Sequence, residues 1–154
     1  MKISNSMFLM LMLLLKRLNS DVRITQINNE LNTQKVIQKH CDSYRLCRKV
    51  IEDCKSAKNP NAYRTKHQSE YQLHDSLKKE LQDLGVTKIP SSNKIQKRIE
   101  HLESEQAATI REKQELRKKQ KTLDIIRQNF TTLLDAPQIS NNDINRTVAS
   151  TLQH

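Results

Sequence analysis

Three cysteines and five histidines are the residues best suited by type to hold a metal ion or to act as nucleophiles. Cys41, Cys47 and Cys54 follow one another at intervals of six and seven residues. Two ligands on one helix must stand three or four residues apart to reach the same zinc ion, and an odd number of cysteines argues against a disulfide framework. We therefore interpret the three cysteines as small buried apolar residues of a protein in a reducing compartment.

The histidines form no catalytic pattern. His67 and His74 fall on one face of a predicted helix, but two turns, or about 10.5 Å, separate them, whereas a zinc–nitrogen bond is about 2 Å long. No Asp, Glu or Tyr completes an acid–base or nucleophile arrangement with them. A single glycine, Gly85, excludes the glycine-rich phosphate loops of nucleotide-binding enzymes. The sequence predicts a protein that is not an enzyme, with no catalytic residue, cofactor or metal site.

The densest group of cations lies in the last long predicted helix and is the candidate for contact with DNA. The chain has 27 Lys and Arg against 17 Asp and Glu, a net charge of +10, and such a chain attracts polyanions by releasing their counterions. Glu112 and Glu115 interleave with the cations, as on a solvated coiled-coil face, so this plainer interpretation stands beside DNA contact. No aromatic residue is interleaved to stack on single-stranded bases. The six candidate residues are Arg111, Lys113, Arg117, Lys118, Lys119 and Lys121.

The composition predicts the long helices that carry these side chains. Apolar residues make up 35% of the chain, against roughly 45–50% in ordinary globular proteins. One Gly and three Pro leave few turns to connect strands. Narrow apolar stripes on long helices fit this composition, whereas a thick core does not. The predicted fold class is all-α: an elongated helical hairpin or coiled coil of two to three long helices, with a disordered C-terminal tail.

Apolar periodicity and helix-ending residues divide the chain into three helices. The first is predicted over about 8–58, and Asn28, Asn29 and Asn32 mark a place in its middle where it can break. Pro60 begins the second helix, and Gly85 ends it as a left-handed C-cap. The third runs from about 92 to 134, with a heptad seam that is only half apolar, so it needs a neighbouring helix or a second chain. Residues 138–154 are predicted to form a flexible tail.

The segment Met7–Leu15 is the one strongly apolar run. As a helix it is about 14 Å long, roughly half the thickness of a bilayer's hydrocarbon core, so it cannot span a membrane. Lys2 precedes it as in a signal peptide, but Lys16 and Arg17 stand where a cleavage site is expected. We favour a helix end packed against a partner helix. Secretion, and a start of translation inside a damaged longer gene, remain as alternatives.

Residues 60–137 resemble the C-terminal helical region of relaxases, the mobilisation nucleases of conjugative and mobilisable elements, including plasmids, common in Gram-positive bacteria. The most specific part is the connector L-G-x-x-K-[IL]-P between two helices. Residues 20–58 match more loosely, as the preceding helix, and residues 1–19 and 138–154 do not match. The residues that carry the resemblance are Tyr63, His67, Glu70, Leu73, His74, Asp75, Lys78, Lys79 and Leu81, then Leu84-Gly85-Val86 and Lys88-Ile89-Pro90-Ser91, and finally Ile126, Asn129, Leu133 and Leu134.

The resemblance implies a segment that works in DNA mobilisation without catalysing it. Relaxases nick DNA with an N-terminal domain that has a tyrosine nucleophile and a metal-binding histidine cluster, and this chain has no such domain, so no catalytic role is transferred to it. The expectation is a cytoplasmic coiled-coil protein, or a truncated remnant of one. Its expected partners are DNA, a relaxase or the transfer machinery, and it is expected to self-associate through its helix seams. The alternative is a basic coiled-coil scaffold or interaction protein without a DNA role.

Overall fold

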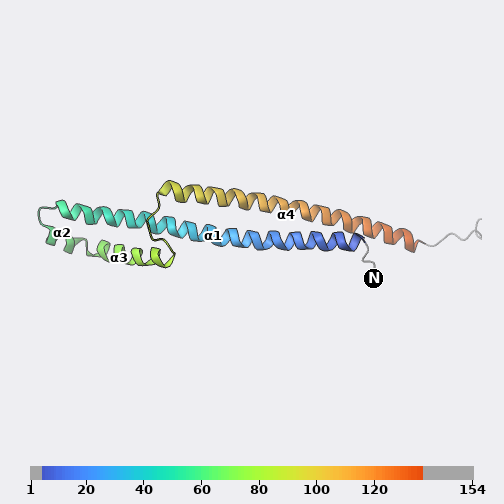
Figure 1. The fold of residues 1–154 in the computed structure, drawn as a ribbon, viewed down its shortest axis with the longest axis horizontal. Helices are drawn as coiled ribbons and strands as arrows, with labels where there is room; N and C mark the ends of the chain where they lie inside the picture. Colours follow the sequence, from blue (N-terminus) through green and yellow to red (C-terminus); the bar gives the residue numbers. More distant parts are fainter. Residues whose placement is uncertain (1–4, 137–154) are drawn as a thin grey trace, which may run out of the picture.

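The computed structural model of the chain describes residues 5–136 and contains, in that range, helices and no strand (Figure 1). The helices are α1 (Asn5–Ser56), α2 (Pro60–Lys66), α3 (Gln68–Asp83) and α4 (Ser92–Asp135). The predicted all-α fold and its elongated hairpin shape are confirmed. The tail predicted over 138–154 lies outside the described residues.

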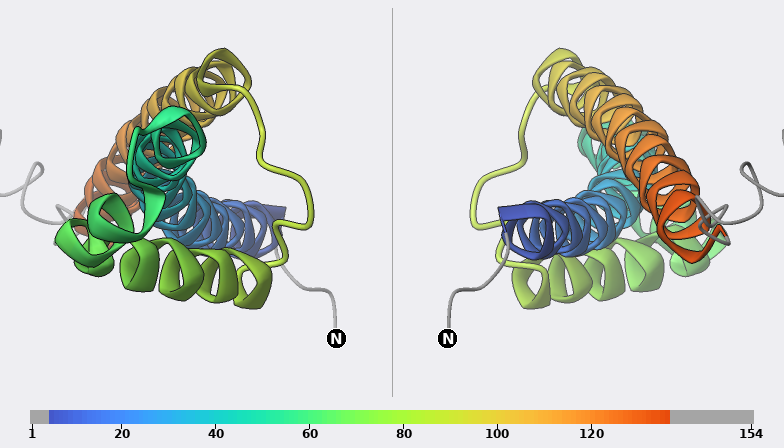
Figure 2. Two further views of the ribbon diagram at one scale, coloured as in Figure 1. Left: turned by 90° about the vertical axis from the view of Figure 1, so that its left-hand side faces the viewer. Right: turned by 90° about the vertical axis from the view of Figure 1, so that its right-hand side faces the viewer.

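The central helix of the fold is α1, and the other helices pack along it (Figure 1). α4 runs antiparallel to α1 toward the N-terminal end of the chain, while α2 and α3 fold back beside the other end of α1. The views along the rod show α3 and α4 on different sides of α1 (Figure 2). Among residues 5–136, the N-terminal part of α1 therefore has only α4 beside it, and the three long helices meet near the middle of the rod.

The main core lies where α1, α3 and α4 meet. Leu81 of α3 and Leu102 of α4 are both fully buried there, as is Cys41 of α1. Tyr44, Val86 and Ile89 pack against the edge of this cluster. Burial of such side chains stabilises the fold by about 1.5–3 kcal/mol each. The buried members of the cluster are Ile27, Leu31, Ile37, Cys41, Leu81, Ile95, Ile99 and Leu102.

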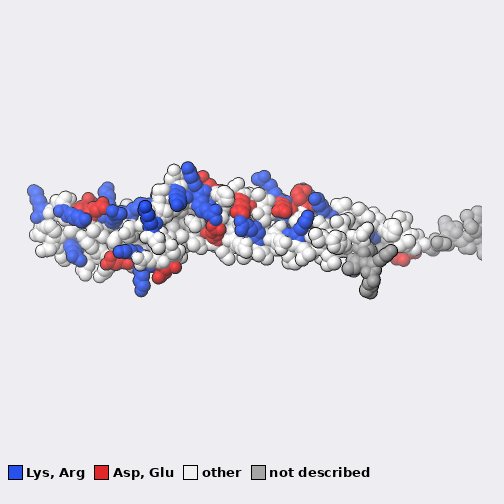
Figure 3. Space-filling view, in the orientation of Figure 1, with Lys and Arg blue, Asp and Glu red and all other residues white. Residues whose placement is uncertain are grey.

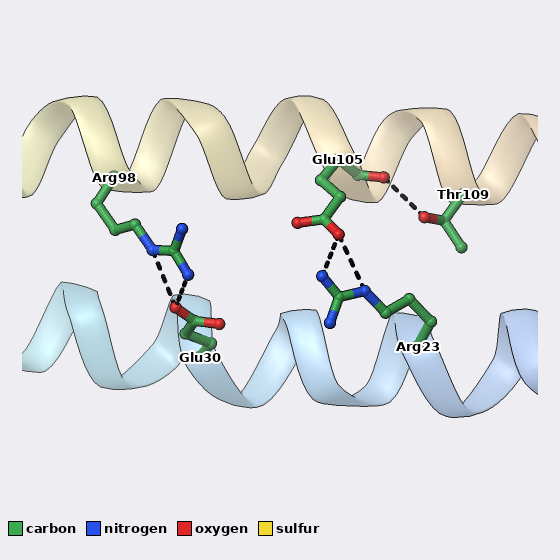
Figure 4. A network of polar contacts seen from close by, with 5 residues as sticks. All are labelled: Arg23, Glu30, Arg98, Glu105 and Thr109. Carbon is green, nitrogen blue, oxygen red and sulfur yellow. Dashed lines mark hydrogen bonds and ion pairs between the residues drawn. The ribbon is translucent and has the colours of Figure 1, made fainter.

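Polar pairs across the α1–α4 seam fix its antiparallel register (Figure 4). Arg23 forms an ion pair with Glu105, and Glu30, seven residues later, pairs with Arg98, seven residues earlier on α4. The Nε–Oε1 distances are 2.9 and 3.0 Å, respectively. A step of seven on both helices is the repeat of a coiled coil. The seam therefore combines apolar packing with charge pairing, as a half-apolar heptad pattern requires.

The predicted break near Asn28, Asn29 and Asn32 is absent, because α1 continues through all three residues. Asn28 accepts a hydrogen bond from Gln106 of α4, and Ile27 and Leu31 are buried on either side of it. Packing against α4 outweighs the low helix propensity of asparagine, which costs well under 1 kcal/mol per residue.

The predicted second helix is instead divided at His67 into α2 and α3. His67 has φ −109° and ψ 27°, outside the helical range. Its ring lies 4.4 Å from that of Tyr63, centroid to centroid, and its Nδ1 is 3.0 Å from Oε1 of Glu70. These contacts with the preceding and following turns hold the chain in the bend. A heptad pattern with polar entries did not distinguish a bent helix pair from one straight helix.

The connector between α3 and α4 contains several residues with defined structural roles. Gly85 has φ +80°, and its N–H donates to Gln82 O at 2.9 Å, while Val86 N–H donates to Leu81 O at 2.8 Å. These bonds close the end of α3 in the way the sequence predicted for a glycine C-cap. Ser91 then caps α4 by accepting from Lys94 N–H at 3.3 Å.

We expect Gly85→Ala to lower the free energy of unfolding by about 1–2 kcal/mol, the cost of placing an L-residue in the left-handed region. A Cβ at this position meets no atom within 4 Å, so the loss comes from backbone conformation and not from a clash. Gly85→Asn is the matched control, because asparagine adopts this conformation more readily. Urea denaturation followed by circular dichroism measures both. Equal losses for Ala and Asn would contradict the conformational explanation.

Candidate nucleic-acid interface

The six candidate cations of α4 point in several directions around the helix and do not form one face. Lys113 points into the seam, is half-buried, and forms an ion pair with Asp21 of α1. The hydrogen bond from Lys113 is the main cause of a lowered pKa at Asp21, and the charges of Lys113, Arg17 and Arg117 add to it. Lys113 is therefore a structural residue of the seam and contributes little to any external site.

Lys118 is engaged by a carboxylate of its own helix. Its Nζ lies 2.8 Å from Oε1 of Glu115, one turn earlier. That hydrogen bond lowers the pKa of Glu115 and raises the pKa of Lys118. Both side chains are largely exposed, so water screens the pair and Lys118 can exchange this partner for a phosphate at little cost. Glu115, one of the two glutamates interleaved with the cations, is thus paired with the cation three residues after it.

A groove of about 400 Å³ between α1 and α4 brings three of the candidates together. Arg17 of α1 forms one wall, with its Nη1 donating to Oε1 of Gln120 across the seam at 3.1 Å. The groove thus has four cations against one carboxylate, Asp124. Its lining residues are Arg17, Arg117, Lys118, Gln120, Lys121 and Asp124.

The remaining two candidates, Arg111 and Lys119, are exposed outside this groove. On the face drawn in Figure 3, Lys and Arg are distributed along the rod with Asp and Glu between them. The charge pattern is therefore a series of local cationic sites and not a continuous basic stripe. The α1–α4 groove receives cations from two helices.

Arg17 is the groove residue that sequence reasoning missed, because 103 residues separate it from Gln120. One signal could have identified it. Arg17 follows Met10 and Leu13 at heptad spacing, so a charged residue stands where the seam calls for an apolar one. An arginine in that position must reach out of the seam to a polar partner or to solvent, and here it reaches Gln120.

The cysteines are buried free thiols, as interpreted from their spacing. Cys41, Cys47 and Cys54 are 0%, 4% and 8% exposed. Burial raises the pKa of the Cys41 and Cys47 thiols, which disfavours the reactive thiolate. Within residues 5–136 no three His, Cys, Asp or Glu side chains converge in a way that could hold a metal ion.

The predicted helix histidines make packing contacts. The His74 ring stacks on Tyr44 of α1, with 4.6 Å between ring centroids, and its Nδ1 lies 3.2 Å from Asp75. His40 of α1 lies 3.1 Å from a carboxylate oxygen of Glu80 on α3. These contacts attach α3 to α1 and account for both side chains without a catalytic role. As to membranes, none of the helices between residues 5 and 136 combines the length and the apolar character needed to cross one.

Comparisons with models of protein families, with curated proteins and with solved structures gave no match to this chain. The resemblance of residues 60–137 to relaxase helical regions is therefore a basis for proposal only. The groove between α1 and α4, with its four cations, is the observation that supports an interface.

Proposed function

We propose that this chain is the non-catalytic helical segment of a relaxase-like mobilisation protein, or a truncated remnant of one, and that it contacts the phosphate backbone of duplex DNA. The observation that carries the proposal is the α1–α4 groove, whose lining contains four cations, Arg17, Arg117, Lys118 and Lys121, and one carboxylate. Phosphate oxygens are the natural partners of guanidinium and ammonium groups held close together. The proposed setting is the bacterial cytoplasm, beside a relaxase or the transfer complex.

The order of the α3–α4 connector supports the relaxase part of this proposal. The resemblance is most specific at Leu84-Gly85-Val86 and Lys88-Ile89-Pro90-Ser91, and this segment contains the left-handed cap, two residues packed on the core and the cap of α4. A connector with so many fixed contacts constrains its sequence strongly.

Affinity for a labelled DNA duplex at two salt concentrations tests the proposal. With four phosphate contacts, binding should weaken about 100-fold between 50 and 200 mM salt, since each contact adds about 0.9 to the salt slope. The double variant Arg117→Gln/Lys121→Gln should lower that slope by about 2. Fluorescence anisotropy titrations measure both quantities.

Lys94→Gln/Lys97→Gln is the matched control, because it removes the same charge from exposed positions of the same helix. Neither lysine has an ion-pair partner among residues 5–136, so we expect the double variant to keep the fold. The control should leave most of the salt slope in place. Equal effects of the two double variants, or no salt-dependent binding at all, would refute the groove as a DNA site.

A scaffold without a DNA role is the second candidate function. It is favoured by the number of cations that already pair with carboxylates across the α1–α4 seam, such as Arg23 with Glu105 and Lys35 with Glu103. On this view the basic side chains fix helix register and the excess charge keeps the rod soluble. Absence of DNA binding together with salt-insensitive self-association would support the scaffold.

A further inference from the structure

The outer face of α1 near its N-terminal end carries a second apolar stripe that the fold leaves uncovered. Its members follow one another at steps of three and four residues, and each is between 51% and 60% exposed. Alternating steps of this kind place side chains along one line of a helix, as in a coiled-coil seam. The stripe consists of Phe8, Leu11, Leu15, Leu18 and Val22.

This stripe is distinct from the seam with α4. The side of α1 that packs on α4 holds Met10, Leu13 and Arg17, which are half-buried, and then the buried Ser20. At about 100° per residue, the stripe lies roughly 150° around the helix from that seam. α3 cannot cover it, because α3 packs along the other end of α1 (Figure 1). A helix that is apolar on two opposite faces is ordinarily buried on both.

We propose that a second copy of this chain covers the stripe, with the two α1 helices antiparallel and a two-fold axis near Leu15. The spacing is self-complementary about that residue: Phe8 stands seven positions before it and Val22 seven positions after it. A two-fold axis at Leu15 therefore places Phe8 of each copy against Val22 of the other. Leu11 stands four residues before Leu15, and Leu18 stands three residues after it. Because these two distances differ, Leu11 of one copy and Leu18 of the other are offset along the axis and can pack as knobs into holes.

Charge favours a second copy in this orientation. The positions that flank the stripe between Met7 and Asn19 are uncharged, and Asp21, beyond them, is paired with Lys113 of α4, whereas Lys16 and Arg17 fall on other sides of the helix. Little charge is visible at this end of the rod on the face drawn in Figure 3. Antiparallel pairing brings together only the apolar faces of the N-terminal ends and directs the rest of the two basic rods away from each other, whereas parallel pairing would align chains of +10 along their whole length. The flanking residues are Met7, Met12, Leu14 and Asn19.

The area is sufficient for a dimer. With Met7, Met12 and Leu14, the face has eight large apolar side chains that are 40–60% exposed. Together they present on the order of 700 Å² of apolar surface, more than the largest patch on a typical monomer. Stable interfaces of standard size take about 600–1,000 Å² from each partner, and this face falls within that range. The inference is independent of the proposed role in DNA mobilisation.

Sedimentation velocity of the full chain under reducing conditions tests the dimer. The wild-type protein should sediment as a species of twice the chain mass. Leu15→Glu should raise the dimer dissociation constant at least about 100-fold, because it sets two carboxylates against each other at the axis. Leu46→Glu is the matched control, since Leu46 is 69% exposed on the same helix but outside the stripe. A monomeric wild type, or equal responses to the two substitutions, would overturn the proposal.

Disulfide trapping tests the orientation. A mixture of Phe8→Cys and Val22→Cys proteins should form a mixed disulfide under mild oxidation, because their Cα atoms would approach within about 7 Å. Each protein alone should remain uncrosslinked, as should the wild type with its buried cysteines. Crosslinking of Phe8→Cys with itself would overturn the antiparallel arrangement. A chain that is monomeric in solution but sediments with phosphatidylcholine vesicles through Leu15 would assign the stripe to lipid and overturn the dimer.

Discussion

Leu81→Ala is expected to lower the free energy of unfolding by about 3 kcal/mol, within the range typical of buried leucines. Leu81 is 1% exposed at the point where α1, α3 and α4 meet. Truncation of this side chain destabilises the fold in two ways. It removes the favourable transfer of buried methyl groups out of water, and it leaves a cavity among residues of three helices. Because α3 has only 16 residues, a helix of this length is marginal without packing. We therefore expect α3 to lose its attachment to α1 first.

Leu73→Ala is the matched control for this prediction, since Leu73 lies on the same helix and is 47% exposed. Its loss should change the free energy of unfolding by less than about 1 kcal/mol. Urea denaturation gives the free energies, and hydrogen exchange locates the loss. Exchange in α3 should accelerate more than exchange in the N-terminal part of α1, which packs only on α4. A uniform acceleration along the rod would mean that the three-helix junction is not a separate stabilising unit.

The sequence predicted the limits of the long helices well because their ends have strong local causes. Pro60 and Gly85 act through their own backbone geometry, and the structure places both at helix ends as expected. The third helix was predicted over about 92–134 and is observed at Ser92–Asp135. Signals of this kind require no knowledge of the neighbouring helix.

The features that the sequence did not reveal depend on contacts between distant residues. The continuity of α1 through its asparagines depends on burial of Ile27 and Leu31 against α4. The bend at His67 depends on contacts with Tyr63 and Glu70 that a heptad pattern does not encode. The same limit applies to the candidate site. The sequence showed the six cations of α4, but it did not show which of them lies in the seam, which pairs with a carboxylate of its own helix and which line the groove. These differences are set by which side of α4 faces α1.

Arg45→Met is expected to lower the free energy of unfolding by about 2 kcal/mol, because it removes the side chain that attaches the connector and the start of α4 to α1. Its guanidinium donates to Ser92 Oγ at 2.7 Å and to the Pro90 carbonyl, and forms an ion pair with Asp42 at 2.6 Å. One hydrogen bond from a charged donor contributes about 1.5–3 kcal/mol, and because Arg45 is partly exposed we expect a loss in the lower half of that range for the whole set of contacts.

Arg45→Lys separates charge from geometry. An ammonium group can keep the ion pair with Asp42, but it lacks the planar fork that reaches Ser92 and Pro90 together. We expect it to lose more than half of what methionine loses. Arg48→Met is the matched control, because in the described part of the chain Arg48 pairs only with Glu52, on the exposed side of the same helix, at 2.9 Å. There the loss should be about 0.5 kcal/mol or less. Hydrogen exchange at residues 86–91 should rise in the Arg45 variants and stay unchanged in Arg48→Met. Full retention of stability by lysine would show that the charge of Arg45, and not its fork, holds the connector.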